Sequence, residues 1–542
     1  MLRPIPYSEP PLVKLSLPTS SPLSHTQSFQ ALEFAQTRDP SDSPETTFPE
    51  TTVVQRFEVV GSTVFSPEEL AVVTEPFTNR PIALAELYEV RSAITQLYTD
   101  QGYVNSGAFI PPQELDEGIV TIQVVEGGVE TINISGTERL RPSYVRDRLA
   151  LATRTPLNIN RLLEALQLLQ LDPLIEGITS ELSASPQPGL SILDIEVVEA
   201  DSFQVRLFVD NQRSPSVGSF RRGVGFTAAN VLGFGDGFRF DYANTDGSNN
   251  VDFNYTIPFN PRNGTISLGF GLGPSDVISQ PFEELDIESD SIYYELTLRQ
   301  PIIQTPSNEF SLGLTASHQS NQTELLDEAF PIAAGADDEG RTKVSAVRFF
   351  QEWVNRGSDS VIALRSQFSL GGGAFGATVN SSELPDSQFF TWRFQGQWVQ
   401  RLAPDTLFLL RTDLQLANDA LLGLEQFRLG GLESVRGYQQ DTLLTDNGLL
   451  LSAEARLPVL RISEWDALLQ VTPFIQYGRG WNDSGLDPNP QDLGSVGLGI
   501  QWQQGDSLSI RAGIGFPWTD ISFPGRSRFE DRVYFSVIYT PF

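Results

Sequence analysis

The stretch that decides the fold reads Val496-Gly-Leu-Gly-Ile-Gln-Trp-Gln-Gln-Gly-Asp-Ser-Leu-Ser-Ile-Arg-Ala-Gly-Ile-Gly-Phe516. Large apolar residues alternate with glycine, glutamine, serine or arginine on both sides of a short Gln-Gly-Asp turn. A period of two residues predicts β-strands whose two faces differ. Because the second face carries small and polar side chains, the pattern is typical of a membrane barrel that surrounds a polar lumen.

The same alternation continues from about residue 203 to the end of the chain and predicts about sixteen strands. Short connections, such as Gly233–Gly237 and Pro301–Asn308, alternate with long ones at about 320–341, 371–386, 418–447 and 517–530. An even number of antiparallel strands with short turns at one end and long loops at the other suits an outer-membrane barrel. We therefore predict an all-β transmembrane barrel over residues 202–542.

Two copies of a repeat of roughly 75 residues precede the barrel. They begin at strands that start with Val54 and Val129, and they close on Val124-Val-Glu126 and Val197-Val-Glu199. Between these ends each copy reads helix, helix, strand, strand; in the first, Ser66-Pro-Glu-Glu69 predicts a capping box. The sequence thus predicts two α+β modules of order β-α-α-β-β over residues 53–128 and 129–201, each with a free sheet edge that an extended chain can join.

Residues 1–52 are rich in proline, serine and threonine, which predicts a flexible leader. The first residues, Met1–Pro11, lack the apolar run of a secretory signal, and by itself this would indicate the cytoplasm. The barrel pattern outweighs it. We expect the cell outer membrane as the location, with the two modules in the periplasm and lipid around the barrel.

The composition excludes several classes of function. Lysine and arginine total 36 against 68 aspartate and glutamate residues, a formal net charge of −32. Nothing offsets phosphate repulsion, so we expect no nucleic acid partner. With no cysteine and two histidines, thiol chemistry is ruled out and most histidine chemistry is disfavoured. His318 has no visible serine partner, so we expect no lumen hydrolase, no metal, no small-molecule cofactor and no enzyme.

Two such modules followed by a sixteen-strand barrel resemble the outer-membrane transporters of two-partner secretion, the haemolysin-activator and filamentous-haemagglutinin-transporter family. The resemblance covers about residues 53–542, and its most specific motif is Val435-Arg436-Gly437-Tyr438 in a long loop between the eleventh and twelfth strands. The resemblance implies that the modules are POTRA (polypeptide-transport-associated) domains. It also implies that they bind an extended exoprotein, which then crosses through or along the barrel.

The resemblance further implies that the loop folds into the lumen, where its arginine meets an aspartate of a Phe-x-Asp-x-Gly strand. The corresponding stretch here is Phe474-Ile-Gln-Tyr-Gly478, with Gln476 in place of the acid. Strand alternation still turns Gln476 inward. Asp413 and Glu454, on the strands that flank the loop, also face inward by period, and either can supply the missing charge to Arg436.

Three alternatives remain open at this point. A barrel-insertion factor of the same superfamily would share the loop motif, although it usually carries more modules. A passive porin with recruitment domains has no reason for the Arg436 loop. An enzyme is the least favoured, for the compositional reasons above.

Overall fold

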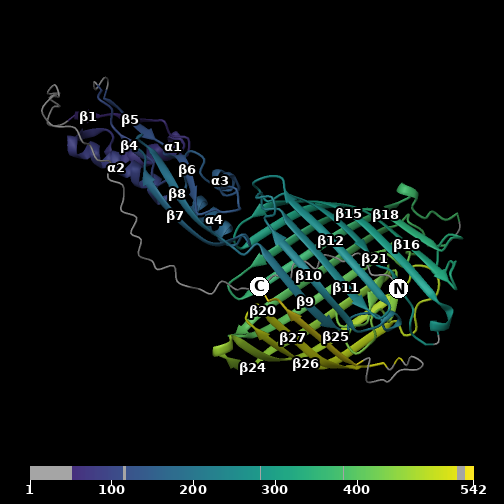
Figure 1. Ribbon diagram of the computed structural model, residues 1–542. Helices are drawn as coiled ribbons and strands as arrows, with labels where there is room; N and C mark the ends of the chain where they lie inside the picture. Colours follow the sequence, from purple (N-terminus) through teal and green to yellow (C-terminus); the bar gives the residue numbers. More distant parts are fainter. Residues whose placement is uncertain are drawn as a thin grey trace. The chain divides into compact units, whose positions relative to one another are not determined.

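The first β-α-α-β-β repeat folds as the sequence predicts (Figure 1). The computed structural model describes residues 52–113, 118–280, 282–381, 384–519, 521 and 532–541. Residues 1–51 of the predicted leader and most of the expected loop at 517–530 lie outside the described residues. The first module contains β1 (Thr52–Val54), β2 (Arg56–Val60), α1 (Pro67–Thr74), β3 (Arg80–Ile82), α2 (Leu84–Asp100), β4 (Gly107–Phe109) and β5 (Ile119–Val125).

Its sheet has the order β2-β5-β4, with β2 parallel and β4 antiparallel to β5. The capping box at the start of α1 is confirmed: Ser66 Oγ accepts from the Glu69 N–H, and the Glu69 carboxylate accepts from the Ser66 N–H. The pair β1–β3 forms a separate two-stranded ribbon that the sequence pattern does not predict.

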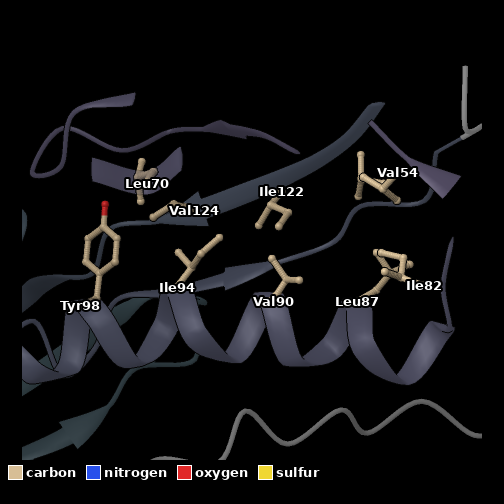
Figure 2. Packing of buried hydrophobic residues seen from close by; sticks show 10 residues of the cluster. Val54, Leu70, Ile82, Leu87, Val90, Ile94, Tyr98, Ile122 and Val124 are labelled. Carbon is tan, nitrogen blue, oxygen red and sulfur yellow. The ribbon is translucent and has the colours of Figure 1, made fainter. Parts of the chain in front are cut away.

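The core of this module lies between α2 and the sheet. Figure 2 shows side chains of α2 pointing toward Ile122 and Val124 of β5. Near the end of α2, Tyr98 is fully buried against the sheet, and its neighbour Leu97 is only partly buried. Tyr98 can be buried because its hydroxyl donates to the carboxylate of Glu126 at 2.9 Å and also bonds Ser62 Oγ at 2.7 Å.

The second module repeats this topology. Its elements are β6 (Gly128–Ser135), α3 (Pro142–Ala150), α4 (Ile159–Gln170), β7 (Ile175–Ala184) and β8 (Leu190–Glu199). The sheet order is β6-β8-β7, so the first and last strands are again parallel neighbours. The repeated Val-Val-Glu ends play the same structural role, since Glu199 accepts from the N–H groups of Glu138 and Leu140, as Glu126 accepts from those of Thr63 and Val64. Each glutamate thus ties the loop before the first helix to the last strand.

The barrel of about sixteen strands is confirmed among the described residues: it is closed and antiparallel throughout. Two-residue strands β14 (Ser275–Asp276) and β17 (Glu328–Ala329) lengthen its outer rim. The sixteen are β9 (Phe203–Asp210), β10 (Arg221–Ala229), β11 (Gly237–Thr245), β12 (Ser248–Pro258), β13 (Thr265–Leu272), β15 (Ile287–Gln304), β16 (Asn308–Leu325), β18 (Arg341–Arg356), β19 (Ser360–Gly372), β20 (Phe390–Ala403), β21 (Thr406–Ala417), β24 (Asn447–Ile462), β25 (Ala467–Trp481), β26 (Asp492–Gln504), β27 (Leu508–Pro517) and β28 (Val533–Tyr539).

The alternation of the sequence corresponds to the two faces of this wall. On β26, Val496, Leu498 and Ile500 are about half exposed on the outside, whereas Ser495 and Gln501 are buried inside. The turn expected from Pro301 is shorter than predicted, because β15 runs on to Gln304 through a register shift that accommodates the missing N–H of proline. None of the described helices is long and apolar enough to cross a membrane.

Candidate functional site in the barrel lumen

The loop between β21 and β24, residues 418–446, is here called the lumen loop. It contains the ribbon of β22 (Phe427–Leu429) and β23 (Leu443–Thr445). Val435, at the start of the sequence motif, is fully buried, and it packs in an apolar cluster that also includes Leu429 and Tyr438. The wall facing this cluster carries glycine: a Cβ on Gly478 would come within 2.8 Å of Leu429 and 3.0 Å of Val435. The loop therefore lies against the inner wall, as the resemblance implies.

Arg436 is the centre of the contact between the tip of the loop and the wall. Its Nη1 lies 2.9 Å from Glu454 Oε2 on β24. The Gln476 Oε1 on β25 accepts from both the backbone N–H of Arg436, at 2.9 Å, and its Nε, at 3.1 Å. The guanidinium also stacks 3.6 Å above the ring of Phe474 and lies 3.5 Å from the Tyr534 hydroxyl on β28. One planar side chain thus ties three strands together.

The residues after Arg436 fix the tip more closely still. Gly437 has a φ of +98°, in the region that favours glycine, and a Cβ there would lie 2.9 Å from the backbone of Gly515 on β27. The converse holds too, since a Cβ on Gly515 would lie 2.6 Å from the carbonyl of Arg436. Tyr438 donates its hydroxyl hydrogen to the Gly494 carbonyl at 3.0 Å and accepts from the Thr519 N–H at 3.2 Å. Backbone lies directly on backbone at this contact.

Of the three partners expected for Arg436, the structure brings two to it. Gln476 and Glu454 both contact it, and Glu454 supplies the charge that Gln476 lacks. Asp413 does not, which corrects that expectation: both its oxygens accept from Arg393 on the neighbouring strand, at 2.9 and 2.7 Å. Asp413 is 4% exposed, and a buried carboxylate needs a partner within reach. Arg393 meets that need from the same wall.

The sequence alone does not identify Phe474 and Tyr534 as contacts of Arg436. It also leaves unexplained why glycine is so frequent on the inner face of the last strands. A Cβ on Gly513 would lie 2.2 Å from the Tyr534 hydroxyl, and one on Gly497 would lie 2.2 Å from the Phe474 ring. The glycines make room for the two rings and for the loop tip. The signal for this was the Gly-x-Gly pattern itself, which marks where another group approaches the strand closely.

His318 differs from expectation in one respect, because a serine partner is present. Its Nδ1 lies 2.8 Å from Ser345 Oγ. The serine hydroxyl, however, donates to the carbonyl of Ala374 at 2.8 Å, and among the described residues no carboxylate orients the imidazole. The pair is thus not arranged as a hydrolytic triad. Within the described part of the chain, one group of three acids lies close enough for a metal ion, and all three are exposed and distant in sequence from Arg436: Asp286, Glu288 and Asp327.

The chain matches two family models. One, described as haemolysin secretion/activation protein ShlB/FhaC/HecB, matches residues 189–502, and the other, described as POTRA domain, ShlB-type, matches residues 52–127. Among curated proteins it is 25% identical over 486 residues to the heme/hemopexin transporter protein HuxB of Haemophilus influenzae, covering 83% of this chain and 80% of that one. It is 22% identical over 488 residues to the outer membrane transporter CdiB of Dickeya dadantii, covering 85% and 82%.

Solved structures that share the fold include CdiB and BamA. CdiB from Escherichia coli superposes with a TM-score of 0.70 at 20% identity, covering 92% of each chain. BamA from Haemophilus ducreyi lacking POTRA domains 1–3 superposes with a TM-score of 0.54 at 16% identity, covering 90% of this chain and all of that one. At these identities the likeness establishes the architecture alone.

Proposed function

Since this chain belongs to the ShlB/FhaC/HecB family of haemolysin secretion and activation proteins, we propose that its lumen loop controls the passage of an extended exoprotein through the barrel. The chain is an outer-membrane transporter of two-partner secretion, with its POTRA modules in the periplasm. We assign residues 53–128 and 129–201 to two POTRA domains and residues 202–542 to the barrel. We propose in addition that the modules bind the exoprotein as an extended chain and that the loop controls its passage.

The observation that carries the proposal is the burial of Arg436. Its side chain is 9% exposed and that of its partner Glu454 is 16% exposed, so the pair is largely removed from water inside the lumen. A pore that only passes small solutes gains nothing from a loop fixed in its path at such a desolvation cost. A transporter that must stay closed between rounds of export does need it. The buried pair therefore favours a gated translocator over a passive porin.

The test is Arg436→Ala. The barrel should still insert and migrate faster in SDS when unheated than when boiled, because a closed strand ladder leaves no free edge. Secretion of the exoprotein should fall to background and ion conductance should change, since the tip loses its anchor. Arg436→Lys should rescue poorly, because an ammonium group cannot bridge Glu454 and Gln476 as a planar fork does. If Arg436→Ala secretes normally at wild-type levels of inserted protein, the tip is an ordinary turn.

We further propose that the exoprotein joins the second module along β7. This strand lies at the edge of its sheet, spans ten residues, and among the described residues pairs on one side only, with β8. An extended chain can add a strand there through backbone hydrogen bonds, with no need for a folded epitope. The other module offers shorter edges, because β2 has five residues and β4 three.

Proline substitutions test this edge. Neighbouring residues of β7 alternate between donating to β8 and pointing their N–H away from it. Proline placed in turn at Thr179, Ser180 and Glu181 therefore removes either an internal or an outward donor. Variants that remove an outward donor should insert and fold normally yet secrete less exoprotein. If all variants that fold secrete at the wild-type rate, β7 is not the docking edge.

A further inference from the structure

The lumen loop makes a second buried contact with the wall, distinct from the one at Arg436. Residues 418–426, here called the outer limb, lead from β21 toward the ribbon of β22 and β23 and the tip. Within this limb, Glu425 is held by Arg348 of β18, whose Nη2 donates to Glu425 Oε1 at 2.6 Å. The side chains are only 7% and 10% exposed. This ion pair is therefore at least as well shielded from water as the Arg436–Glu454 pair.

Neighbouring side chains complete the contact. Gln319 of β16 donates to the same Glu425 oxygen at 3.2 Å, and Arg348 also donates to Ser317 of β16. In the same limb, Leu421 and Leu422 pack against inward side chains of the wall in a buried apolar cluster. The limb is thus seated on β16 and β18 by one charged pair, one hydrogen bond from a neutral amide to the same carboxylate and a small apolar patch, and Gln415 of β21 also donates to the Glu425 carbonyl at 3.0 Å.

The two contacts lie on different parts of the barrel. Around the wall, β19, β20 and β21 separate β18 from β24, the first strand that Arg436 contacts, and the Arg436 site extends on to β28. The limb and the rest of the loop are joined by Arg428, which lies 3.1 Å from Asp441 and donates to the Gly423 carbonyl at 3.0 Å. A single linked loop is therefore held at two separated places and crosses the lumen between them.

The two contacts also differ in kind. At the tip, a backbone N–H, a guanidinium, an aromatic ring and two glycine backbones all meet the wall, so releasing it breaks several close-packed contacts at once. The limb is held by the Arg348–Glu425 pair, by hydrogen bonds from Gln319 and Gln415 to Glu425, and by the apolar patch around Leu421 and Leu422. Loss of the charged pair leaves Arg348 with a remaining acceptor in Ser317. These polar contacts of the limb with β16, β18 and β21 converge on one residue, Glu425, so the limb is the end that a change at a single residue can release.

We propose that the Arg348–Glu425 pair is the releasable latch of this transporter. With the latch closed, the outer limb lies across the lumen; with it open, the limb swings away from β16 and β18 while Arg436 keeps the tip in place. Arg348 and Glu425 are positioning residues for transport and do not themselves bind the exoprotein. The inference rests on the proposed passage of the exoprotein through the lumen.

The test compares two glutamates. Glu425→Gln opens the latch, and Glu309→Gln is the matched control, since Glu309 also lies 2.6 Å from an arginine, Arg299, but both residues belong to the wall. The full-length proteins are reconstituted in planar bilayers without exoprotein. Glu425→Gln should raise the fraction of time spent open by about tenfold, which corresponds to about 1.4 kcal/mol, and Glu309→Gln should not. Equal conductance in all three proteins, or an equal rise in both variants, overturns the latch.

Two further variants keep the test independent of folding and of the proposed function. Exchanging the charges, Arg348→Glu with Glu425→Arg, should return the open fraction toward the wild-type value. If this double variant is open for as large a fraction of the time as Glu425→Gln, the latch is overturned. The chain has no cysteine, so Gln319→Cys with Glu425→Cys can be cross-linked selectively. The cross-linked protein should stay closed and stop secreting until it is reduced. Secretion at the wild-type rate while cross-linked overturns the latch, whereas a conductance change without any effect on secretion refutes the transport role alone.

Discussion

Removing Glu454, the acid that neutralises Arg436, should abolish transport. Placing an acid at position 476 instead should restore it. In Glu454→Gln, Arg436 keeps its bonds to Gln476 and the Phe474 ring but loses its only charged partner among the described residues. The second change, Gln476→Glu, puts a carboxylate where the Gln476 amide oxygen now accepts two N–H groups. The double variant therefore has the same residues with the charge transferred from β24 to β25.

The magnitude follows from the geometry. Two unit charges 2.9 Å apart attract by about 6 kcal/mol at an effective dielectric constant of about 20. The lost hydration of both groups offsets part of this, and removing one partner of a buried pair costs about 3–5 kcal/mol. Because the amide of the variant still accepts a hydrogen bond, we expect about 3 kcal/mol. That shifts the balance between anchored and released tip about a hundredfold.

The assay measures exoprotein secretion together with bilayer conductance, in proteins whose heat-modifiable mobility shows an intact barrel. The single Glu454→Gln variant should secrete little and conduct erratically, and adding Gln476→Glu should restore both. Ser452, which now accepts from Gln476 Nε2 at 3.1 Å, can donate its hydroxyl hydrogen to the new carboxylate. A single variant that behaves as wild type refutes the claim that charge fixes the tip. A double variant no better than the single shows that the position of the acid matters, not only its presence.

Two predictions concern other parts of the molecule. Gly515→Val should displace the tip, because even a Cβ at this position lies 2.6 Å from the Arg436 carbonyl; secretion should fall in a barrel that still inserts, and normal secretion would show that the tip can retreat freely. In the first module, burial of Glu126 opposes its ionisation, but hydrogen bonds from Thr63 and Tyr98 outweigh this and hold its pKa below the ordinary value. The lowered pKa stabilises the folded state above about pH 4.5, and this stabilisation is lost as the pH falls through the pKa of Glu126 in the folded protein. Thermal unfolding of residues 52–200 should therefore show the wild type more stable than Glu126→Gln by about 1 kcal/mol at pH 7, with a difference that disappears toward pH 3. A stability difference that does not change with pH would contradict the ionised carboxylate as its source.

Much of the fold could be predicted from the two-residue alternation of the strands and from the repeat of roughly 75 residues. A residue's place in a strand fixes which face it occupies, because successive side chains point to opposite sides. This is why Gln476, Glu454 and Asp413 were all correctly placed on the inner face, and why the strand count followed from the turns. The repeat likewise showed in the paired Val-Val-Glu ends. The structural role of Glu126 and Glu199 did not show, because it depends on loops about sixty residues away in sequence.

The choice between inward-facing acids was decided by the tertiary structure alone. The two-residue period assigns each side chain to the inner or the outer face of the barrel. It gives neither the height of that side chain along the barrel nor its neighbour across the lumen. Asp413 is committed to Arg393 on the adjoining strand, while Glu454 lies at the level where the tip of the loop descends. The Arg348–Glu425 pair is a still longer connection, 77 residues apart in the chain, and no local pattern marks it. The sequence alone therefore determined the architecture, the inward face and the motif on the loop, since these follow from local periodicity. Which charges meet inside the lumen depends on strand register, barrel closure and the path of the loop, and these exist only once the barrel is closed.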